Sequence, residues 1–274
     1  MELGRSPFIS RREHFAVVGS TNDLVGRWLA DGTPEVCVAI ADHQTSGRGR
    51  EGRVWRAAPG TALLMSLGFR PTWLRPEHVW RLAAVVSVAM AEAAERVAGL
   101  AAETIRLKWP NDLVAVSSSE STPSVRKIAG ILGETTGLGT DDPRAIVGIG
   151  TNVDWARAAF PPEIAGEMTS LRELAGGRRL DRGELTEMFL GELDGLVTHL
   201  RRGVFDAGAW QSRQLTNDTP VRVHHADGHD EVVTARRVDP DTGGLVVEAD
   251  GIERTVLAGE IQRVRLADTV QARV

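Results

Sequence analysis

The sequence has little cysteine and little lysine, and both shortages limit what it can do. Its 274 residues include one cysteine, Cys37, so no disulfide can form within the chain. Cys37 lies in the apolar run VCVAIA, which is typical of a buried strand and not of a nucleophile or a metal ligand. Of the 32 basic residues, only Lys108 and Lys127 are lysine. Because lysine is a compact point charge and arginine a planar fork, these two lysines invite a chemical explanation.

Long apolar segments are also missing. No run approaches the roughly 18 to 20 apolar residues that a membrane-spanning helix needs, and the start of the chain, MELGRSPFISRREHF, has no apolar stretch of signal-peptide length. We therefore expect a cytoplasmic protein that contacts no membrane. An apolar fraction of 42% supports a substantial core in one large domain and a small one.

Strand and helix patterns are interspersed in residues 1–216. Apolar strand patterns occur at FAVVG, EVCVAIADHQ, TALLMSLGFR, IRLKW, LVAV, KIAGILGETT and RAIVGIGTNVD. Helical patterns follow Ser20, which can act as an N-cap, begin again at Pro76, and occupy roughly residues 169–175 and 182–202. We expect an α+β fold in which helices pack on a mixed β-sheet of six or seven strands.

The sequence pattern changes in residues 217–274. Short β-rich runs are separated there by Asp-Gly, Asp-Pro and Gly-Gly turns, which predicts a small SH3-like β-barrel. This part contains 11 acidic and 7 basic residues, so it is a poor surface for nucleic acid. The adjacent His224 and His225 face opposite sides of a predicted strand and have no further ligand cluster beside them, so we interpret them as ordinary strand residues.

An arginine- and glycine-rich loop is the most unusual segment. Residues 47–56, GRGREGRVWR, hold four arginines and three glycines in a chain of formal net charge -5. The loop could be a solvated basic turn, a nucleic-acid contact or a clamp for a small phosphorylated ligand. The clamp explains both residue types, because glycines let the backbone approach and arginines fork onto phosphate or carboxylate oxygens. A P-loop is excluded, since no Gly-Lys-Ser/Thr ending is present. We expect a mobile flap between two strands, with Trp55 either closing over a nucleobase or packing in the core.

Three later segments supply a context for the flap. Residues 108–112, KWPND, place one of the two lysines at a strand end beside a rigid turn. Gly130 and Gly150 each interrupt an apolar strand, which weakens the strand unless something must pass close to its backbone. The pattern predicts a slot in one face of the sheet.

Five segments in order carry a family resemblance. They are residues 19–22 (GSTN), 44–55 (QTSGRGREGRVW), 108–112 (KWPND), 127–132 (KIAGIL) and 150–153 (GTNV). Their order and approximate spacing resemble the motif series of biotin protein ligases, and the resemblance covers nearly the whole chain. It implies a catalytic domain of the biotin/lipoate ligase kind at residues 1–216 and the β-barrel at 217–274. Because the catalytic strand begins near Phe15, we expect the monofunctional form, which lacks an N-terminal DNA-binding domain.

The resemblance implies an adenylation followed by a transfer. ATP and biotin are the expected substrates, Mg²⁺ is expected with ATP, and no tightly bound prosthetic group is expected. Biotin's carboxylate would attack the α-phosphate, giving biotinyl-5′-AMP and pyrophosphate, and a lysine of a biotin carboxyl carrier protein domain would take the acyl group. Both steps depend mainly on positioning and charge stabilisation. This agrees with the lack of any Ser-His-Asp or Cys-His arrangement suited to a covalent intermediate.

The resemblance also implies which residues bind biotin. The expected set is Ser20, Thr21, Asn22, Gln44, Arg48, Gly49, Arg50, Lys108 and Gly130. Within it, Ser20, Thr21 and Gln44 would hydrogen-bond the ureido ring or line its slot. Gly130 would let biotin pass the sheet.

A second set is expected around ATP and the adenylate. It comprises Arg48, Arg50, Arg53, Trp55, Lys108, Asn111 and Asn152. Lys108, Arg48 and Arg50 are the expected catalytic residues, with the Lys108 ammonium between the biotin carboxylate and the α-phosphate. The role of Lys127 stays open, because a solvent-facing position at a strand edge is as plausible as a functional role. The ligands of Mg²⁺ stay unknown, since that ion often keeps its waters and binds mainly through substrate phosphates.

Three alternatives remain from the sequence. Lipoate ligases and octanoyl transferases share this kind of domain, although the flap and KWPND match the biotin ligases better. A DNA-binding repressor related to the ligases is a second alternative, and we predict no specific DNA binding. A nonenzymatic module that binds small acids is the third and leaves Lys108 unexplained. For the assembly we expect a monomer or a weak homodimer.

Overall fold

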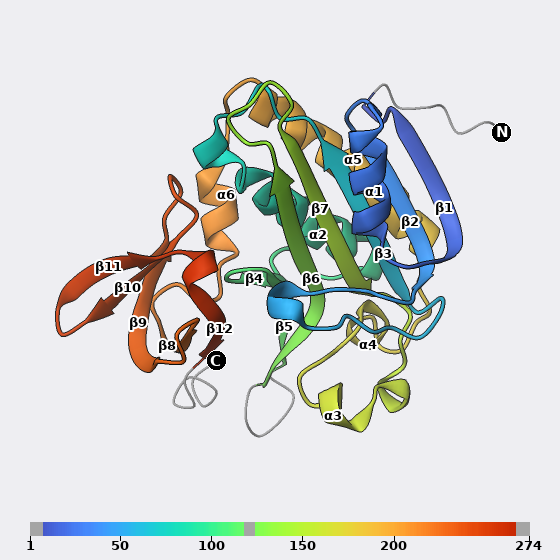
Figure 1. The fold of residues 1–274 in the computed structure, drawn as a ribbon. Coiled ribbons are helices and arrows are strands. Elements are labelled where there is room, and N and C mark those ends of the chain that lie inside the picture. The colour runs from blue at the N-terminus through green and yellow to red at the C-terminus, as the bar shows by residue number, and fades with distance from the viewer. Residues whose placement is uncertain (1–7, 118–123, 267–274) are drawn as a thin grey trace.

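A seven-stranded mixed sheet forms the centre of the protein (Figure 1). The computed structural model describes residues 8–117 and 124–266. The strands, in chain order, are β1 (Arg11–Val18), β2 (Cys37–Gln44), β3 (Ala62–Phe69), β4 (Ile105–Lys108), β5 (Asp112–Ser117), β6 (Ser124–Thr136) and β7 (Arg144–Asn152). They lie in the order β1-β2-β3-β7-β6-β5-β4, and only β1 and β2 pair in parallel. The predicted sheet of six or seven strands is confirmed.

One face of the sheet is covered by α1 (Thr21–Ala30), which begins directly after β1. Val25, Trp28 and Leu29 of this helix pack against Cys37 and Ala39 of β2. Burial raises the pKa of the Cys37 thiol to about 11, so the cysteine is an inert core residue at neutral pH, as the sequence predicted.

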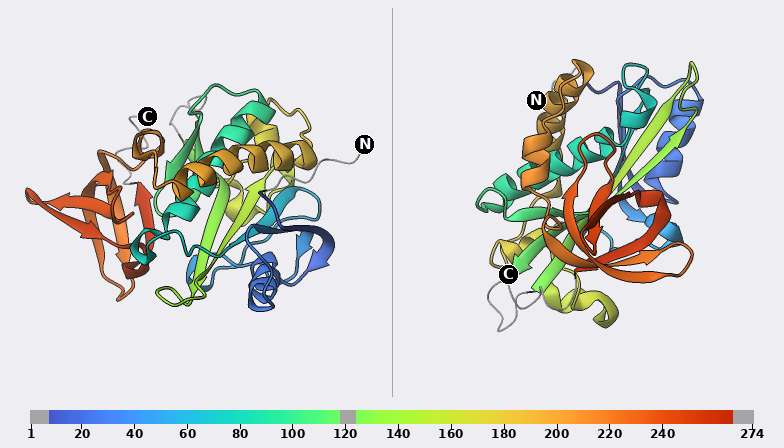
Figure 2. Two further views of the ribbon diagram at one scale, coloured as in Figure 1. Left: turned by 90° about the horizontal axis from the view of Figure 1, so that it is seen from above. Right: turned by 90° about the vertical axis from the view of Figure 1, so that its left-hand side faces the viewer.

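Two long helices cover the opposite face, α2 (Arg81–Ala98) and α5 (Arg182–Arg201) (Figures 1 and 2). All eight residues of β3 are buried, because this central strand has helices on both of its faces. Helix α2 is itself buried along most of its length and ends at Gly99, whose φ of 70° is the left-handed geometry typical of a helix end. Three short helices complete this part: α3 (Pro162–Ala165), α4 (Leu171–Leu174) and α6 (Ala207–Ser212).

Five antiparallel strands form the C-terminal domain, seen at one side of the molecule in Figure 2. They are β8 (Thr219–His225), β9 (Asp230–Val238), β10 (Leu245–Ala249), β11 (Ile252–Val256) and β12 (Ile261–Leu266), in the order β11-β10-β9-β8-β12. The predicted fold class is confirmed, while the domain boundary at residue 217 stays a prediction. The predicted strand histidines are hydrogen-bonded within the domain, with His224 Nδ1 2.7 Å from Asp230 Oδ1 and His225 Nε2 2.6 Å from Glu231 Oε1. No helix in the described ranges is long and apolar enough to cross a membrane.

The connection to this domain is hydrogen-bonded along the outer edge of the large sheet. Leu107 N of β4 donates to Arg213 O at 2.7 Å, and Leu215 N donates to Leu107 O at 2.8 Å. Leu107 and Gln214 thereby form a parallel β-bridge, so the connecting segment is bonded to the edge of the sheet at β4. The C-terminal domain is consequently attached to the strand that carries Lys108.

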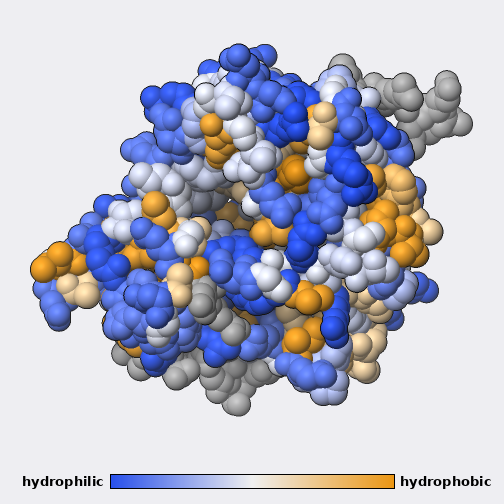
Figure 3. All heavy atoms as spheres, in the orientation of Figure 1, coloured by the Kyte–Doolittle hydropathy of each residue, from blue (hydrophilic) through white to orange (hydrophobic). Residues whose placement is uncertain are grey.

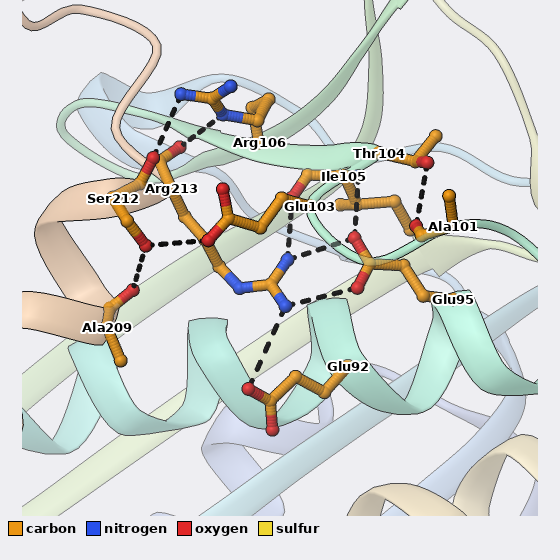
Figure 4. Close-up of polar contacts among 10 residues, drawn as sticks. All are labelled: Glu92, Glu95, Ala101, Glu103, Thr104, Ile105, Arg106, Ala209, Ser212 and Arg213. Carbon is orange, nitrogen blue, oxygen red and sulfur yellow. Dashed lines mark hydrogen bonds and ion pairs between the residues drawn. The ribbon is translucent and has the colours of Figure 1, made fainter.

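A buried ion pair fixes this attachment (Figure 4). Glu95 of α2 and Arg213 are 4% and 5% exposed, and their side chains meet through two hydrogen bonds of 2.9 and 3.1 Å. Both also hold the first residue of β4, because Glu95 accepts from Ile105 N at 2.8 Å and Arg213 donates to Ile105 O at 3.1 Å. One pair of charges therefore joins α2, β4 and the connection.

Breaking this pair should destabilise the fold. Glu95→Ala removes both of these hydrogen bonds from the buried Arg213 guanidinium and leaves it only the longer contact to Glu92 at 3.8 Å, so we expect the free energy of unfolding to fall by about 3 kcal/mol. Urea denaturation measures it. Glu253→Ala is the matched control, since its pair with Arg237 is roughly half exposed and should contribute less than about 1 kcal/mol. Equal losses in the two variants would contradict the argument.

Candidate functional site

A cavity of about 720 Å³ opens between the large sheet and the C-terminal domain. We name residues 47–56 the flap; it connects β2 to β3 and covers one side of this cavity. The other walls come from the β4–β5 turn, the glycines of β6 and β7, residues 161–168 and β12. The space-filling view shows the molecule hollowed near its centre (Figure 3).

The structure brings together nearly all of the residues predicted from the motifs. Those that line the cavity are Ser20, Thr21, Asn22, Gln44, Arg48, Gly49, Arg50, Arg53, Trp55, Lys108, Asn111 and Gly130. Asn152 differs from the expectation: it is fully buried, lies outside the lining, and donates from Nδ2 to Thr169 O at 3.0 Å. The reason is its position at the end of β7, where the side chain is directed at the backbone of Thr169 and not at the cavity.

Hydrogen bonds fix the polar groups at one end of the cavity. Gln44 Oε1 accepts from both Thr21 N and Thr21 Oγ1, at 2.7 and 2.9 Å. Ser66 Oγ lies 2.7 Å from Thr21 Oγ1 and 2.5 Å from Asn22 Oδ1, and Asn22 Nδ2 donates to Glu134 Oε2 at 2.7 Å. With its oxygen so engaged, Gln44 presents its amide nitrogen as the group that can meet a ligand.

Ser20 stands at the N-terminus of α1 and is 5% exposed. It occupies the N-cap position, as predicted, but its hydroxyl makes no capping hydrogen bond within the described residues. The hydroxyl and the first turn of the helix therefore both belong to the cavity wall. A helix N-terminus favours ligand atoms that carry negative charge or accept hydrogen bonds.

Arg48 of the flap is held by acids of the large domain. Its guanidinium makes two hydrogen bonds to Asp23, at 2.6 and 2.9 Å, and a longer one to Glu134 at 3.4 Å. The hydrogen bond from Arg48 holds the pKa of Asp23 below its usual value. The aspartate stays ionised above its ordinary pKa, so the pair persists at neutral pH and is lost only as the pH falls through the lowered value.

Arg50 is held from the opposite side by the C-terminal domain. Its Nη2 donates to the carbonyl oxygens of Ala258 and Ile261, at 2.5 and 3.2 Å. The side chain is 14% exposed, and this burial lowers the pKa of the guanidinium. The two flap arginines thus contact different domains, and Arg50 is matched only by carbonyl dipoles and by Glu51 at 3.9 Å among its described contacts.

Trp55 lies in the slot that the glycines form. A Cβ built on Gly150 would sit 2.6 Å from the Trp55 ring, and one on Gly130 would sit 3.1 Å from it. Trp55 Nε1 is buried and has no hydrogen-bond partner within the described residues. Trp55 packs on the sheet and also lines the cavity, so both uses predicted for it stay open.

Lys127 is the residue whose importance the sequence left undecided. It does not face only solvent: its Nζ lies 2.5 Å from Asp112 Oδ1 and 5.4 Å from the centre of the Trp55 ring, inside the cavity wall. The Nζ also lies 3.0 Å from where a Cβ of Gly130 would be. Lys108 lines the same cavity, so both lysines of the chain meet there. Their rarity in an arginine-rich sequence was the signal that could have found Lys127.

Comparisons with known proteins identify the family and the fold. A family model described as the biotin/lipoate A/B protein ligase family matches residues 14–152. The chain belongs to this family. Its resemblance to the biotin protein ligases, predicted from the five segments, is confirmed by the relatives that follow.

Two curated relatives cover most of this family member. A biotin–[acetyl-CoA-carboxylase] ligase of Mycobacterium tuberculosis is 35% identical over 91% of the chain and 88% of its own length. The bifunctional ligase/repressor BirA of Escherichia coli is 32% identical over 89% of the chain and 71% of its own length. Among solved structures, the biotin protein ligase of Aquifex aeolicus in complex with biotin and ATP is 25% identical, with a TM-score of 0.75 over 94% of the chain and 99% of its own.

The contact between Arg48 and Asp23 should control access to the flap. Asp23→Asn removes the charge that orders Arg48, so we expect trypsin to cut the flap about two to ten times faster, as for the loss of one partly exposed charged hydrogen bond. Mass spectrometry of timed digests measures the rate after each flap arginine. Asp31→Asn, at the other end of the same helix and exposed, is the control and should change nothing. Unchanged cleavage in Asp23→Asn would refute this role.

Proposed function

We propose that this chain is an ATP-dependent biotin–[acetyl-CoA-carboxylase] ligase. In the first step a carboxylate oxygen of biotin attacks the α-phosphorus of ATP and pyrophosphate leaves. In the second a lysine amine of a carrier protein attacks the acyl carbon and AMP leaves. One observation carries the proposal: residues from separate motifs line a single cavity, in a fold that matches a relative's complex with biotin and ATP.

The hydrogen-bonded end of the cavity suits the ureido ring of biotin. That ring presents two N–H donors and one carbonyl acceptor, and the wall offers the Ser20 hydroxyl, the Gln44 amide and the N-terminus of α1. The network through Thr21, Asn22 and Glu134 orients these groups before a ligand arrives. Such preorganisation reduces the entropy that binding must offset. Biotin's remaining atoms would then lie along the glycines of β6 and β7.

Charge is the main obstacle to the first step, because a carboxylate must approach a triphosphate. Lys127 and Lys108 line the cavity, and the flap adds Arg48, Arg50 and Arg53 to its walls. We assign the charge-stabilising role jointly to Lys108 and Lys127. The contact of Lys127 with Asp112 and its place beside Gly130 favour it as the lysine closest to the reacting groups. Fixed cations in a site that excludes water stabilise developing negative charge well.

An apolar end of the cavity suits the adenine base. Pro161, Ile164 and Met168 line it, together with Val125 of β6. This segment is tied to Lys127, because Lys127 N donates to Glu167 O at 2.8 Å and Thr169 N donates to Lys127 O at 2.9 Å. The base-binding end and the lysine are therefore positioned by the same backbone pairing.

Mg²⁺ was expected with ATP. The described residues include no group of three His, Cys, Asp or Glu side chains that could hold a metal ion. We propose that Mg²⁺ enters on the phosphates of ATP, an arrangement that needs no such group.

The flap protects the intermediate. Biotinyl-5′-AMP is a mixed anhydride that water hydrolyses, so closure over the cavity serves the transfer by excluding water. We propose a biotin carboxyl carrier protein domain as the acceptor. The absence of specific DNA binding stays a prediction, which an operator-binding assay tests.

Biotin-dependent exchange of pyrophosphate into ATP tests the first step. We expect exchange with the wild type, and at least about 100-fold slower exchange in Lys127→Ala, the usual scale for removing one electrostatic contact to a transition state. Lys108→Ala and Arg48→Ala should also slow exchange. Arg106→Ala is the control, because Arg106 lies beside Lys108 on β4 but lines no part of this cavity.

Other outcomes would redirect the assignment. Exchange supported by lipoate or octanoate but not by biotin would move the chain to the sister ligases. No exchange with any of these acids would contradict ligase activity. A large loss in Lys108→Ala with none in Lys127→Ala would return the charge-stabilising role to Lys108 alone, as the motifs predicted.

A further inference from the structure

A second cavity, of about 330 Å³, adjoins the first. Its walls come from α2, the adjoining segments of β6 and β7, α6 and the C-terminal domain. The two cavities share a partition made by residues 108–112 and Arg50. Apart from this partition, the lining is mainly apolar and includes Trp80, Ala83 and Trp210. The flap reaches the second cavity only through Arg50.

One buried polar group of this second cavity lacks a hydrogen-bond partner among the described residues. Gln214 is 5% exposed and lines the cavity, and its Oε1 has no hydrogen-bond partner among the described residues. A buried acceptor without a partner costs free energy, so a donor on a ligand would be favoured there. Gln214 pairs with Leu107 in the backbone ladder, which places it next to Lys108 and the shared partition.

The transfer step needs a path by which the acceptor amine reaches the acyl-adenylate. The inference about this path rests on the proposed function. The acyl-adenylate occupies the first cavity beneath the flap, so an acceptor amine has to arrive from another side while the flap stays closed. A lysine side chain is a four-carbon apolar stem with an amine at its tip, which matches apolar walls that lead to one buried acceptor. We propose that the second cavity is the entry channel for the acceptor lysine of the carrier protein and that Gln214 binds its amine.

The charges at the partition favour the reactive form of that amine. The acid of the partition, Asp112, is already paired with Lys127 at 2.5 Å. The apolar walls and the nearby cations Lys108 and Arg50 then disfavour an ammonium, so they lower the pKa of an entering lysine. The neutral amine donates one hydrogen to Gln214 Oε1 and directs its lone pair at the acyl carbon. The C–N bond then forms, the C–O bond to phosphate breaks with its electron pair on AMP, and the nitrogen releases one proton to solvent.

The test compares the two half-reactions in the full chain. The first readout is biotin-dependent pyrophosphate exchange, and the second is single-turnover transfer from preformed biotinyl-5′-AMP to an apo biotin carboxyl carrier domain. In Gln214→Leu we expect the ratio of transfer rate to exchange rate to fall about tenfold, as for the loss of one hydrogen bond to a buried group. Gln211→Leu is the matched control: Gln211 lies at the end of α6, three residues before Gln214, bonds Val238 O of the C-terminal domain and lines neither cavity. Its ratio should stay within about twofold of the wild type.

A second variant tests the channel itself. Ala83→Phe projects a ring from α2 into the second cavity, so it should block transfer to the carrier domain more strongly than exchange. An unchanged ratio in both Gln214→Leu and Ala83→Phe, or an equal loss of both half-reactions, would overturn the channel. Absence of biotin-dependent exchange in the wild type would instead overturn the proposed function. The two failures are therefore distinguishable.

Discussion

The site depends on the absence of side chains at three positions in the central strands. A Cβ on Gly148 would lie 2.2 Å from Asn22 Oδ1, and a Cβ on Gly150 would lie 2.6 Å from the Trp55 ring. Real Cβ atoms essentially never approach other atoms below 3.0 Å. The bare backbone of β7, and of β6 at Gly130, therefore lets polar and aromatic groups reach the sheet itself. The other walls of the cavity surround this glycine-lined part of the sheet.

The flap connects the two domains through its arginines. Arg48 bonds to Asp23 of the large domain and Arg50 to carbonyls of the C-terminal domain, so each basic group already has a partner of negative or partly negative character. A phosphorylated ligand offers Arg50 stronger acceptors than its present carbonyl partners. Its binding would exchange contacts between domains for contacts to the ligand, which ties the position of the C-terminal domain to the state of the site.

The motifs predicted the site better than they predicted the role of each residue. The strands and the C-terminal β domain could be predicted from the apolar patterns and turns. The meeting of residues such as Gln44, Arg48 and Lys108 could be predicted because their segments resemble the motif series of a known family. The place of Asn152 could not, since one residue decides which face of β7 a side chain takes. Lys127 and Glu95 could not be ranked either, because their partners Asp112 and Arg213 are brought to them only by tertiary packing.

The pairing of the connecting segment with β4 has a further consequence for how copies of the protein meet. A sheet has two edges, and an open edge is a template on which another strand can add. At β4 the edge is occupied by the chain's own residues around Gln214. At the other end β1 pairs only with β2 among the described strands, and its first half, Arg11 to His14, consists entirely of charged or ionisable side chains. One edge is thus occupied by backbone of the same chain, and the other carries charged or ionisable side chains. Both features disfavour aggregation through the outermost strands of the large sheet.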